Sequence, residues 1–197
     1  MFLTTNKYLV YLTIIFLGFL LRFYYANYES YWFDEQISFF VANPELSFKE
    51  TLARSYTTDL SPVFYNLVLK YYFTVFNYSP DLGRYLSIIT GLLGVIFLSF
   101  ISYQISKYKS LMLTLFLASF NIYLITYSAE TRPYSTIFFL SSLNVYLFIR
   151  CFILKSTNKL LSFTFFIISI LTLLIHPFTI LIIGSQILFI LFKDFNY

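Results

Sequence analysis

The run YLSIITGLLGVIFLSFISYQIS at positions 85–106 contains no charged residue and decides the class of fold. A helix needs roughly 20 apolar residues to cross about 30 Å of hydrocarbon, and this run is long enough. The remaining sequence has the same character, because 59% of the residues are hydrophobic, 23% are aromatic and only 11% are charged. This composition predicts an integral membrane protein built from helices.

Other charge-poor runs lie on both sides of this span. We expect further spans at 8–23, 110–127 and 133–149. The stretch 160–192 would be about 50 Å long as one helix, so we expect it to divide at His176-Pro177 into two short spans. The sequence therefore predicts an all-α polytopic membrane protein of about six transmembrane helices, in a single module over residues 1–197.

The segment 24–84 is predicted to form a long outer loop between the first two spans. Its apolar stretch 62–76 has Lys70 near the middle, which favours an interfacial or re-entrant helix over a crossing. Positions 45–58 mix apolar and charged residues and predict a helix on the outer surface. The first span is followed by aromatic residues and not by a small-residue cleavage site, so we interpret it as an uncleaved anchor.

Charges in the short loops predict the orientation, with the N-terminus in the cytoplasm. This arrangement puts every acidic residue except Asp194 outside. The residues expected inside are Lys7, Lys107, Lys109, Arg150, Lys155, Lys159 and Lys193. Arg22 and several cations of the long loop are exceptions, because they would lie outside.

Several classes of function are disfavoured by composition. The net charge of +4 comes from scattered residues and forms no basic stripe, so we expect no nucleic-acid partner. A single cysteine, Cys151, excludes an internal disulfide, and the single histidine leaves no zinc motif. A divalent metal is compatible with the hard oxygens of Asp34 and Glu35, but no second close carboxylate pair completes a site, so we expect no obligatory metal or other cofactor.

Potentially reactive residues are predicted to gather on the outer face, where three separate turns supply them. They are Asp34, Glu35, Asp59, Lys70, Asp81, Arg84, Glu130, Arg132 and His176. Acids, cations and a histidine on one face can bind an anionic headgroup and activate an acceptor hydroxyl. Carboxylates so close to lipid are rare unless they have a function.

Each of these residues also has a purely structural interpretation. Asp34 and Glu35 could simply begin a helix, with Asp34 as its N-cap. Arg84 could be a snorkelling anchor, and Glu130 and Arg132 could be ordinary loop charges. His176 before Pro177 could be a polar turn residue.

An ordered set of motifs resembles the GT-C glycosyltransferases. It is most similar to their bacterial branch, which is related to protein O-mannosyltransferases and to the transferases that add aminoarabinose or galacturonic acid to lipid A. The motifs are Tyr31-Trp32-Phe33-Asp34-Glu35, Asp59-Leu60-Ser61-Pro62-Val63-Phe64-Tyr65, Gly83-Arg84-Tyr85-Leu86-Ser87 leading to Gly91, Tyr127-Ser128-Ala129-Glu130-Thr131-Arg132-Pro133-Tyr134, and His176.

The resemblance implies transfer of a sugar from a polyprenyl-phosphate carrier to an acceptor hydroxyl, with inversion, on the extracytoplasmic face of a bacterial inner membrane. By the resemblance, Asp34 is the catalytic base and Glu35 supports it. Arg132 is the first choice for phosphate contact and Arg84 the second. Asp59, Glu130 and His176 are the other expected substrate-binding residues.

Two departures from the family pattern matter. Many relatives have a histidine or lysine and two prolines where this chain has Ser61-Pro62-Val63, which puts carrier binding by that loop in doubt. Relatives also continue through more spans, so the chain resembles an N-terminal catalytic part and is expected to need a partner chain or a homo-oligomer for activity. The alternative is a non-enzymatic membrane protein: an inactive fragment, an assembly partner or a transporter-like bundle.

Overall fold

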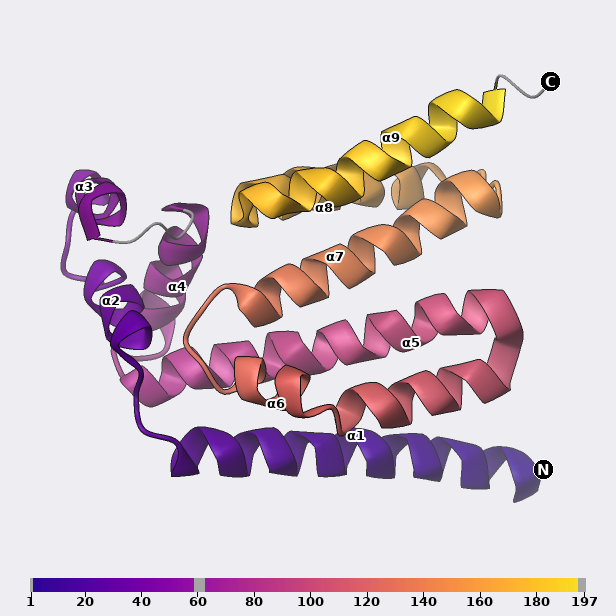
Figure 1. Ribbon diagram of the computed structural model, residues 1–197, viewed down its shortest axis with the longest axis horizontal. Helices are drawn as coiled ribbons and strands as arrows, with labels where there is room; N and C mark the ends of the chain where they lie inside the picture. Colours follow the sequence, from indigo (N-terminus) through magenta and orange to yellow (C-terminus); the bar gives the residue numbers. More distant parts are fainter. Residues whose placement is uncertain (1, 59–62, 195–197) are drawn as a thin grey trace.

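The computed structural model describes residues 2–58 and 63–194, and these residues form helices with no strand among them. Long helices lie side by side along the molecule, while three shorter helices form a cap at one end (Figure 1). In chain order the helices are α1 (Phe2–Tyr28), α2 (Phe33–Val41), α3 (Phe48–Thr58), α4 (Val63–Val75), α5 (Pro80–Ser119), α6 (Ile122–Ser128), α7 (Tyr134–Phe148), α8 (Lys159–Ile175) and α9 (Ile180–Asp194). The start of α1 and the end of α9 lie at the end opposite the cap.

Three helical segments in the described part of the chain are long and apolar enough to cross a membrane. They are Lys7–Tyr28, Pro80–Ser119 and Tyr134–Ile153, the last of which includes a π-helical turn, Ile149–Ile153. The helices at the C-terminal side, Lys159–Ile175 and Pro177–Phe192, are apolar but shorter. The all-helical membrane class is thus supported, whereas the number of spans remains a prediction.

Helix α5 is a hairpin and not one rod. It reverses at Ser106 and Lys107, where Lys107 has a φ of 61° and a ψ of −143°. The Ser110 hydroxyl donates to the Ser102 carbonyl at 2.7 Å, and Thr114 donates to the Ser102 hydroxyl at 2.8 Å, so the two arms are tied beside the turn. The expected separation of spans 85–106 and 110–127 is therefore present as a tight reversal (Figure 1).

The predicted helix at 110–127 does not run unbroken. The second arm of α5 ends at Ser119, and α6 begins only at Ile122. Asn121 caps the new helix, because its side-chain oxygen accepts from the Leu124 amide at 3.1 Å. The expected division at His176-Pro177 is confirmed, since His176 is extended (φ −164°) and its ring nitrogen accepts from the Phe178 amide at 3.2 Å.

Arg22 joins α1 to the end of the α5 hairpin. Its guanidinium is fully buried and donates to the carbonyls of Gly18 (3.0 Å), Ser119 (2.9 Å) and Ala118 (3.4 Å), and Nε donates to Ser128 Oγ at 3.2 Å. Arginine is suited to this position because the last carbonyls of a helix lack partners and carry the negative end of its dipole. Arg22 was an exception to the charge rule that predicts the orientation. In the structure it is buried and caps the end of α5.

Polar side chains also link the last three helices. Asn144 of α7 donates to Ser169 of α8 at 2.8 Å, and Gln186 of α9 donates to the Asn144 carbonyl oxygen at 2.7 Å. Hydrogen bonds of this kind hold apolar helices together where the hydrophobic effect does not distinguish helix from lipid. They fix α8 and α9 against α7.

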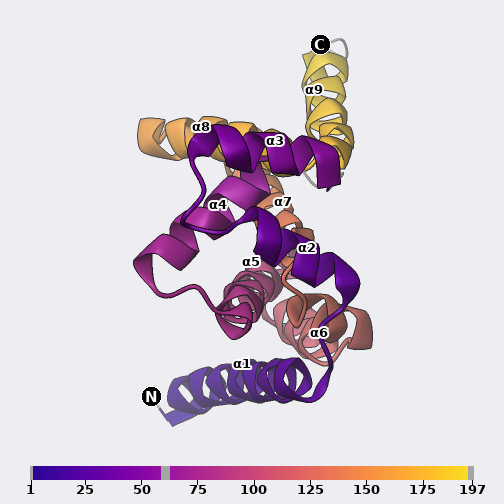
Figure 2. The same ribbon diagram turned by 90° about the vertical axis from the view of Figure 1, so that its left-hand side faces the viewer.

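The cap formed by α2, α3 and α4 is packed onto the bundle by α4. Tyr65, Leu69 and Phe73 of α4 are buried with Leu140 of α7 and Ile175 of α8. Seen end-on, the cap crosses the ends of the long helices (Figure 2). The helices expected at 45–58 and 62–76 are therefore present as α3 and α4. Helix α2 lies with them at the cap end of the molecule (Figure 1).

Candidate functional site

Glu35 and Arg84 form a buried ion pair at the centre of the candidate site. Arg84 Nε lies 2.9 Å from Glu35 Oε1, and Nη2 lies 2.7 Å from Oε2, so the pair is bidentate. The side chains are 1% and 2% exposed for Glu35 and Arg84, respectively. Glu35 lies in the first turn of α2 and Arg84 lies in the first turns of α5, so the pair joins the cap to the bundle.

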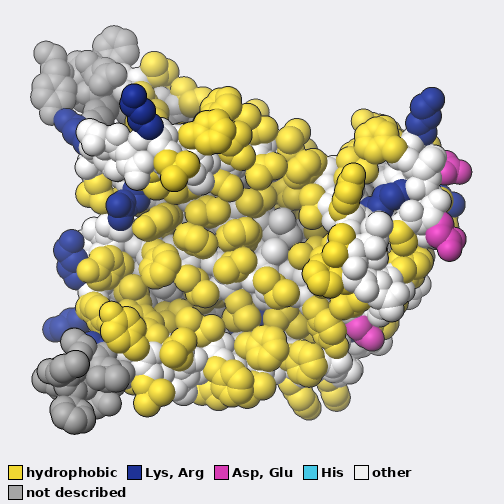
Figure 3. Space-filling view, turned by 180° about the vertical axis from the view of Figure 1, so that it is seen from behind, with side chains coloured by type: hydrophobic (Ala, Val, Ile, Leu, Met, Phe, Trp, Pro, Cys, Tyr) yellow, Lys and Arg dark blue, Asp and Glu magenta, His cyan; other side chains and the backbone are white. Residues whose placement is uncertain are grey.

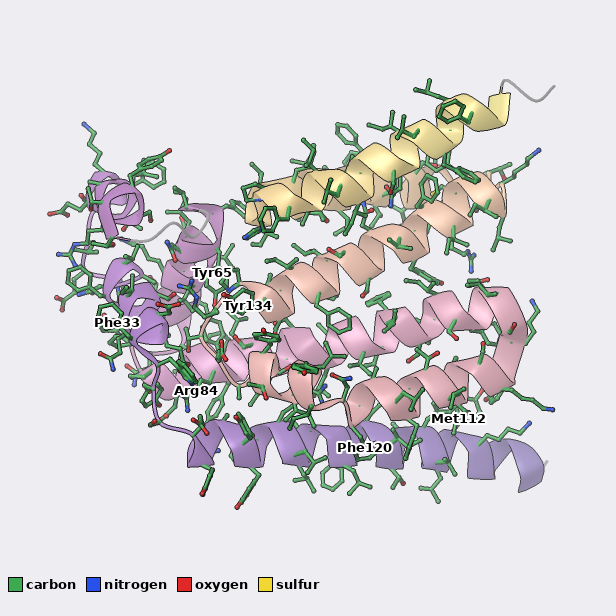
Figure 4. The ribbon with its side chains drawn as sticks, viewed as in Figure 1. Phe33, Tyr65, Arg84, Met112, Phe120 and Tyr134 are labelled. Atoms are coloured by element: carbon green, nitrogen blue, oxygen red, sulfur yellow. The ribbon has the colours of Figure 1, made fainter. Side chains whose placement is uncertain are left out.

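Arg84 also holds the chain that leaves α1. Its terminal nitrogens donate to the carbonyls of Ala26, Glu29 (2.7 Å) and Ser30 (3.0 Å), which belong to the end of α1 and the turn after it. The guanidinium stacks 4.0 Å from the Tyr31 ring centre. Arg84 is therefore directed into the protein and does not snorkel to the surface. Figure 4 shows it at the cap end of the bundle.

Glu35 reaches two backbone amides as well as Arg84. Its Oε1 accepts from the Thr131 amide at 2.8 Å, and its Oε2 accepts from the Trp32 amide at 3.1 Å. The second bond caps the start of α2, with Trp32 in the N-cap position. The helix-start interpretation is thus correct for Glu35, but Asp34 is not the N-cap.

Gly83 permits the loop 129–133 to lie against α5. A Cβ at this position would come within 2.5 Å of Thr131 Cγ2. Because Thr131 must stay close for its amide to reach Glu35, glycine is needed on this face of the helix. The motif Gly83-Arg84 therefore provides both the space and the charge that fix the second loop.

Asp34 occupies a very different environment from its neighbour. Its side chain is 63% exposed, and one carboxylate oxygen lies 3.7 Å from Nη2 of Arg132. Arg132 Nη1 lies 3.4 Å from the Asp34 carbonyl oxygen and 3.3 Å from the Ser38 hydroxyl. Arg132 is itself largely buried, at 13% exposure. The structure thus brings an accessible carboxylate and a held guanidinium together.

Glu130 lies beside this pair and is half-buried. Burial, followed by the negative charge of Glu35, raises the pKa of Glu130, while Arg132 acts in the opposite direction. The Glu130 carbonyl accepts from the Arg132 amide at 2.8 Å, which closes a tight turn. Glu130 can therefore hold a proton at a higher pH than an ordinary glutamate.

Asp81 and Lys70, which were also expected on the outer face, make structural contacts. Asp81 accepts from the Tyr31 hydroxyl, and burial together with this hydrogen bond raises the pKa of Tyr31 to about 12. Lys70 of α4 donates to the Leu46 carbonyl and to Thr51 Oγ1 at 3.1 Å. Lys70 thus ties α4 to α3.

The two remaining predicted substrate-binding residues are Asp59 and His176. Asp59 lies outside the described residues. His176 accepts from the Phe178 amide and lies against the Phe178 ring at 4.9 Å between centres, which fits the turn-residue interpretation. Burial lowers the pKa of His176, so its imidazole is neutral near pH 7.

A cavity of about 300 Å³ adjoins the ion pair. Tyr31, Glu35, Gln36, Phe39, Pro80 and Thr131 line it. This volume is at the lower end of the range for small-molecule sites. The described residues include no group of three or more His, Cys, Asp or Glu side chains placed to hold a metal ion.

Two groups of the candidate site were not expected from the sequence. Ser38 lies one helical turn after Asp34 and orients Arg132, and the Thr131 amide binds Glu35. The spacing of four residues could have placed Ser38 on the face of Asp34, but no local pattern links either residue to a partner more than 90 positions away.

In comparisons with known proteins, no family model, no curated protein and no solved structure matches this chain.

Proposed function

We propose that this protein takes part in glycosyl transfer from a polyprenyl-phosphate sugar to an acceptor hydroxyl, as its motifs' resemblance to GT-C enzymes suggests. The observation that carries the proposal is the Asp34–Arg132 arrangement, in which the two charged groups lie 3.7 Å apart at the cap end of the bundle. The adjacent Glu35–Arg84 pair is buried and supports the loops that supply them. The chemistry is therefore assigned to Asp34 and Arg132.

In the proposed reaction, Asp34 takes the proton of the acceptor hydroxyl as its oxygen attacks the anomeric carbon. The bond between that carbon and the phosphate oxygen breaks, and the electron pair leaves with the polyprenyl phosphate. Arg132 binds this phosphate, where negative charge grows, and its contacts with Ser38 and the Asp34 carbonyl fix its orientation. One displacement inverts the configuration.

Arg132 is favoured over Arg84 as the phosphate ligand because of where each guanidinium lies. Arg84 is committed to a bidentate carboxylate and to carbonyls of the turn after α1. Arg132 lies beside the exposed Asp34 carboxylate. Arg84 is therefore proposed as a positioning residue, together with Glu35.

The experiment measures sugar transfer from polyprenyl-phosphate donors. It uses membranes from cells that make the chain. Asp34→Asn is expected to lower transfer by roughly 10²-fold or more, because a general base contributes about that much. Glu45→Gln removes another exposed carboxylate of the cap and should leave transfer unchanged. Normal transfer by a well-folded Asp34→Asn protein would remove Asp34 from the mechanism.

Donor binding separates the two roles. Arg132→Gln should weaken binding of a short-chain polyprenyl phosphate by about tenfold, as expected for loss of a charged hydrogen-bonding partner. Asp34→Asn should bind it at least as well as the unaltered protein does. Undiminished binding by Arg132→Gln would contradict the phosphate assignment.

A further inference from the structure

A second cavity, of about 500 Å³, lies at the opposite end of the bundle from Asp34 and Arg132. Tyr11 of α1, Ser99 and Tyr103 of the first α5 arm, Tyr108 of the second arm, and Tyr146 of α7 contribute to its wall. Both arms of α5 contribute to its wall together with α1 and α7. The proposed transferase does not use it.

The wall of this cavity is mainly hydrocarbon and aromatic, with phenol groups among apolar side chains. Ile15, Ile96, Leu111 and Leu115 supply aliphatic surface. Tyr11 and Tyr108 pack edge to face with 5.8 Å between ring centres, and Tyr103 packs against Tyr108 at 6.3 Å. A surface of this kind suits an acyl chain, and tyrosine is the side chain typical of the membrane–water boundary.

Cationic side chains adjoin the cavity. Arg150, from the π-helical turn after α7, lines it directly. Lys7 lies 4.8 Å above the Tyr108 ring, and Lys107 lies 5.7 Å above the Tyr103 ring, so both ammonium groups are beside cavity residues.

No carboxylate neutralises these cations within the described side chains. Every described Asp and Glu side chain lies in 29–50 or at 81 and 130, in and next to the cap. On the face seen in Figure 3, several basic groups lie at one end with no acidic group visible among them, whereas the visible acidic groups lie at the other end beside further basic groups. An external anion is therefore the natural partner of the cations beside the cavity.

We propose that this cavity binds one anionic phospholipid, with an acyl chain among the tyrosines and its phosphate at Arg150 and Lys7. A soluble anion would leave the long apolar wall uncovered, and a neutral lipid would leave the cations unpaired. The phospholipid satisfies both parts, and its headgroup would lie at the end of the membrane-crossing helices. The site is independent of the proposed transferase function.

Native mass spectrometry of the delipidated protein tests this with phosphatidylglycerol and phosphatidylcholine of equal chain length. We expect one phosphatidylglycerol per chain, preferred about tenfold over phosphatidylcholine. Arg150→Gln should reduce that preference to within about twofold. Lys159→Gln removes an exposed cation outside the cavity lining and should keep it. Equal binding of the two lipids by the unaltered protein would overturn the proposal. So would an equal loss of the preference for phosphatidylglycerol in Arg150→Gln and Lys159→Gln.

A steric variant tests the acyl-chain part separately. Ile96 is half-buried on the cavity wall, so Ile96→Phe should fill part of the space and lower binding of both lipids. Undiminished binding by this variant, with an unchanged helical spectrum, would place the lipid elsewhere. Soluble glycerol phosphate should not displace the lipid, and efficient displacement would indicate a site for soluble anions and overturn the proposal.

Discussion

The neighbours Asp34 and Glu35 have similar chemistry but opposite environments. Glu35 is buried against Arg84, and Asp34 is mostly exposed. Glu35→Gln should destabilise the fold by about 3–5 kcal/mol, because it leaves the Arg84 charge buried without a carboxylate. Asp34→Asn should change the free energy of unfolding by about 0.5 kcal/mol or less. Unfolding titrations in mixed micelles measure both, and equal effects would contradict the assigned roles.

Glu130 gives a pH-dependent prediction. Burial and the nearby Glu35 charge raise its pKa, so the folded protein binds this proton more tightly than the unfolded chain does. Its contribution to stability is therefore fully present below the unfolded pKa and is lost as pH rises through the raised folded pKa. The thermal midpoint of the unaltered protein, relative to Glu130→Gln, should increase as pH falls through this window. A difference in thermal midpoint that does not change with pH would contradict the assignment.

The sequence identified the aromatic-Asp-Glu stretch as a candidate site but not which acid would be accessible. That distinction depends on Arg84, 49 positions away, and on the Thr131 amide, 96 positions away. Local rules describe a helix start well, since Glu35 occupies the third position of α2 and accepts from the Trp32 amide. They contain no information on which distant group completes the pair.

Helix α5 packs against α6 and α7 through its glycines. A Cβ at Gly91 would come within 2.1 Å of Ser128 Oγ and 2.9 Å of Ser128 Cβ, and Ser128 is the residue that accepts from Arg22. Gly91→Ala should therefore cost about 1–3 kcal/mol through overpacking.

Gly184 in α9 provides the matched control for this substitution. A Cβ there meets nothing within 4 Å, so Gly184→Ala should be neutral or stabilise by up to about 1 kcal/mol through helix propensity. Thermal midpoints of the two variants give the comparison. A loss of stability in Gly184→Ala as large as that in Gly91→Ala would show that close packing is not the cause.

Element boundaries were predictable where the signal is local. Pro177 predicts the break after α8, and the charges at 107 and 109 predict the reversal in α5. The interruption at Phe120 and Asn121 was not expected, because an apolar run with no Gly or Pro offers only the Asn121 cap as a cue. Arg22 of the first helix donates to the Ser119 carbonyl at the end of that arm. Nothing in the sequence around Ser119 indicates this distant partner.

The whole molecule separates its charges along its long axis, with acids in and next to the cap and many of the cations at the opposite end (Figure 3). We therefore expect Glu45 to face the outside and Lys109 to face the cytoplasm. In a Cys151→Ser background, an impermeant thiol reagent applied to intact cells should label Glu45→Cys and spare Lys109→Cys. Both positions are exposed, so the reverse pattern would overturn the orientation and the location of the proposed reaction.

The interior position of Arg22 has a consequence for how the protein is made. Its carbonyl partners lie 96 and 97 positions further along the chain, and its serine partner lies 106 further. During synthesis, α1 therefore emerges with a guanidinium whose only native partner so far is Gly18 within its own helix. A lone arginine is costly in hydrocarbon. We therefore expect the first helix to reach its final place only after the α5 hairpin and α6 have been made, because these later segments supply the remaining partners of Arg22.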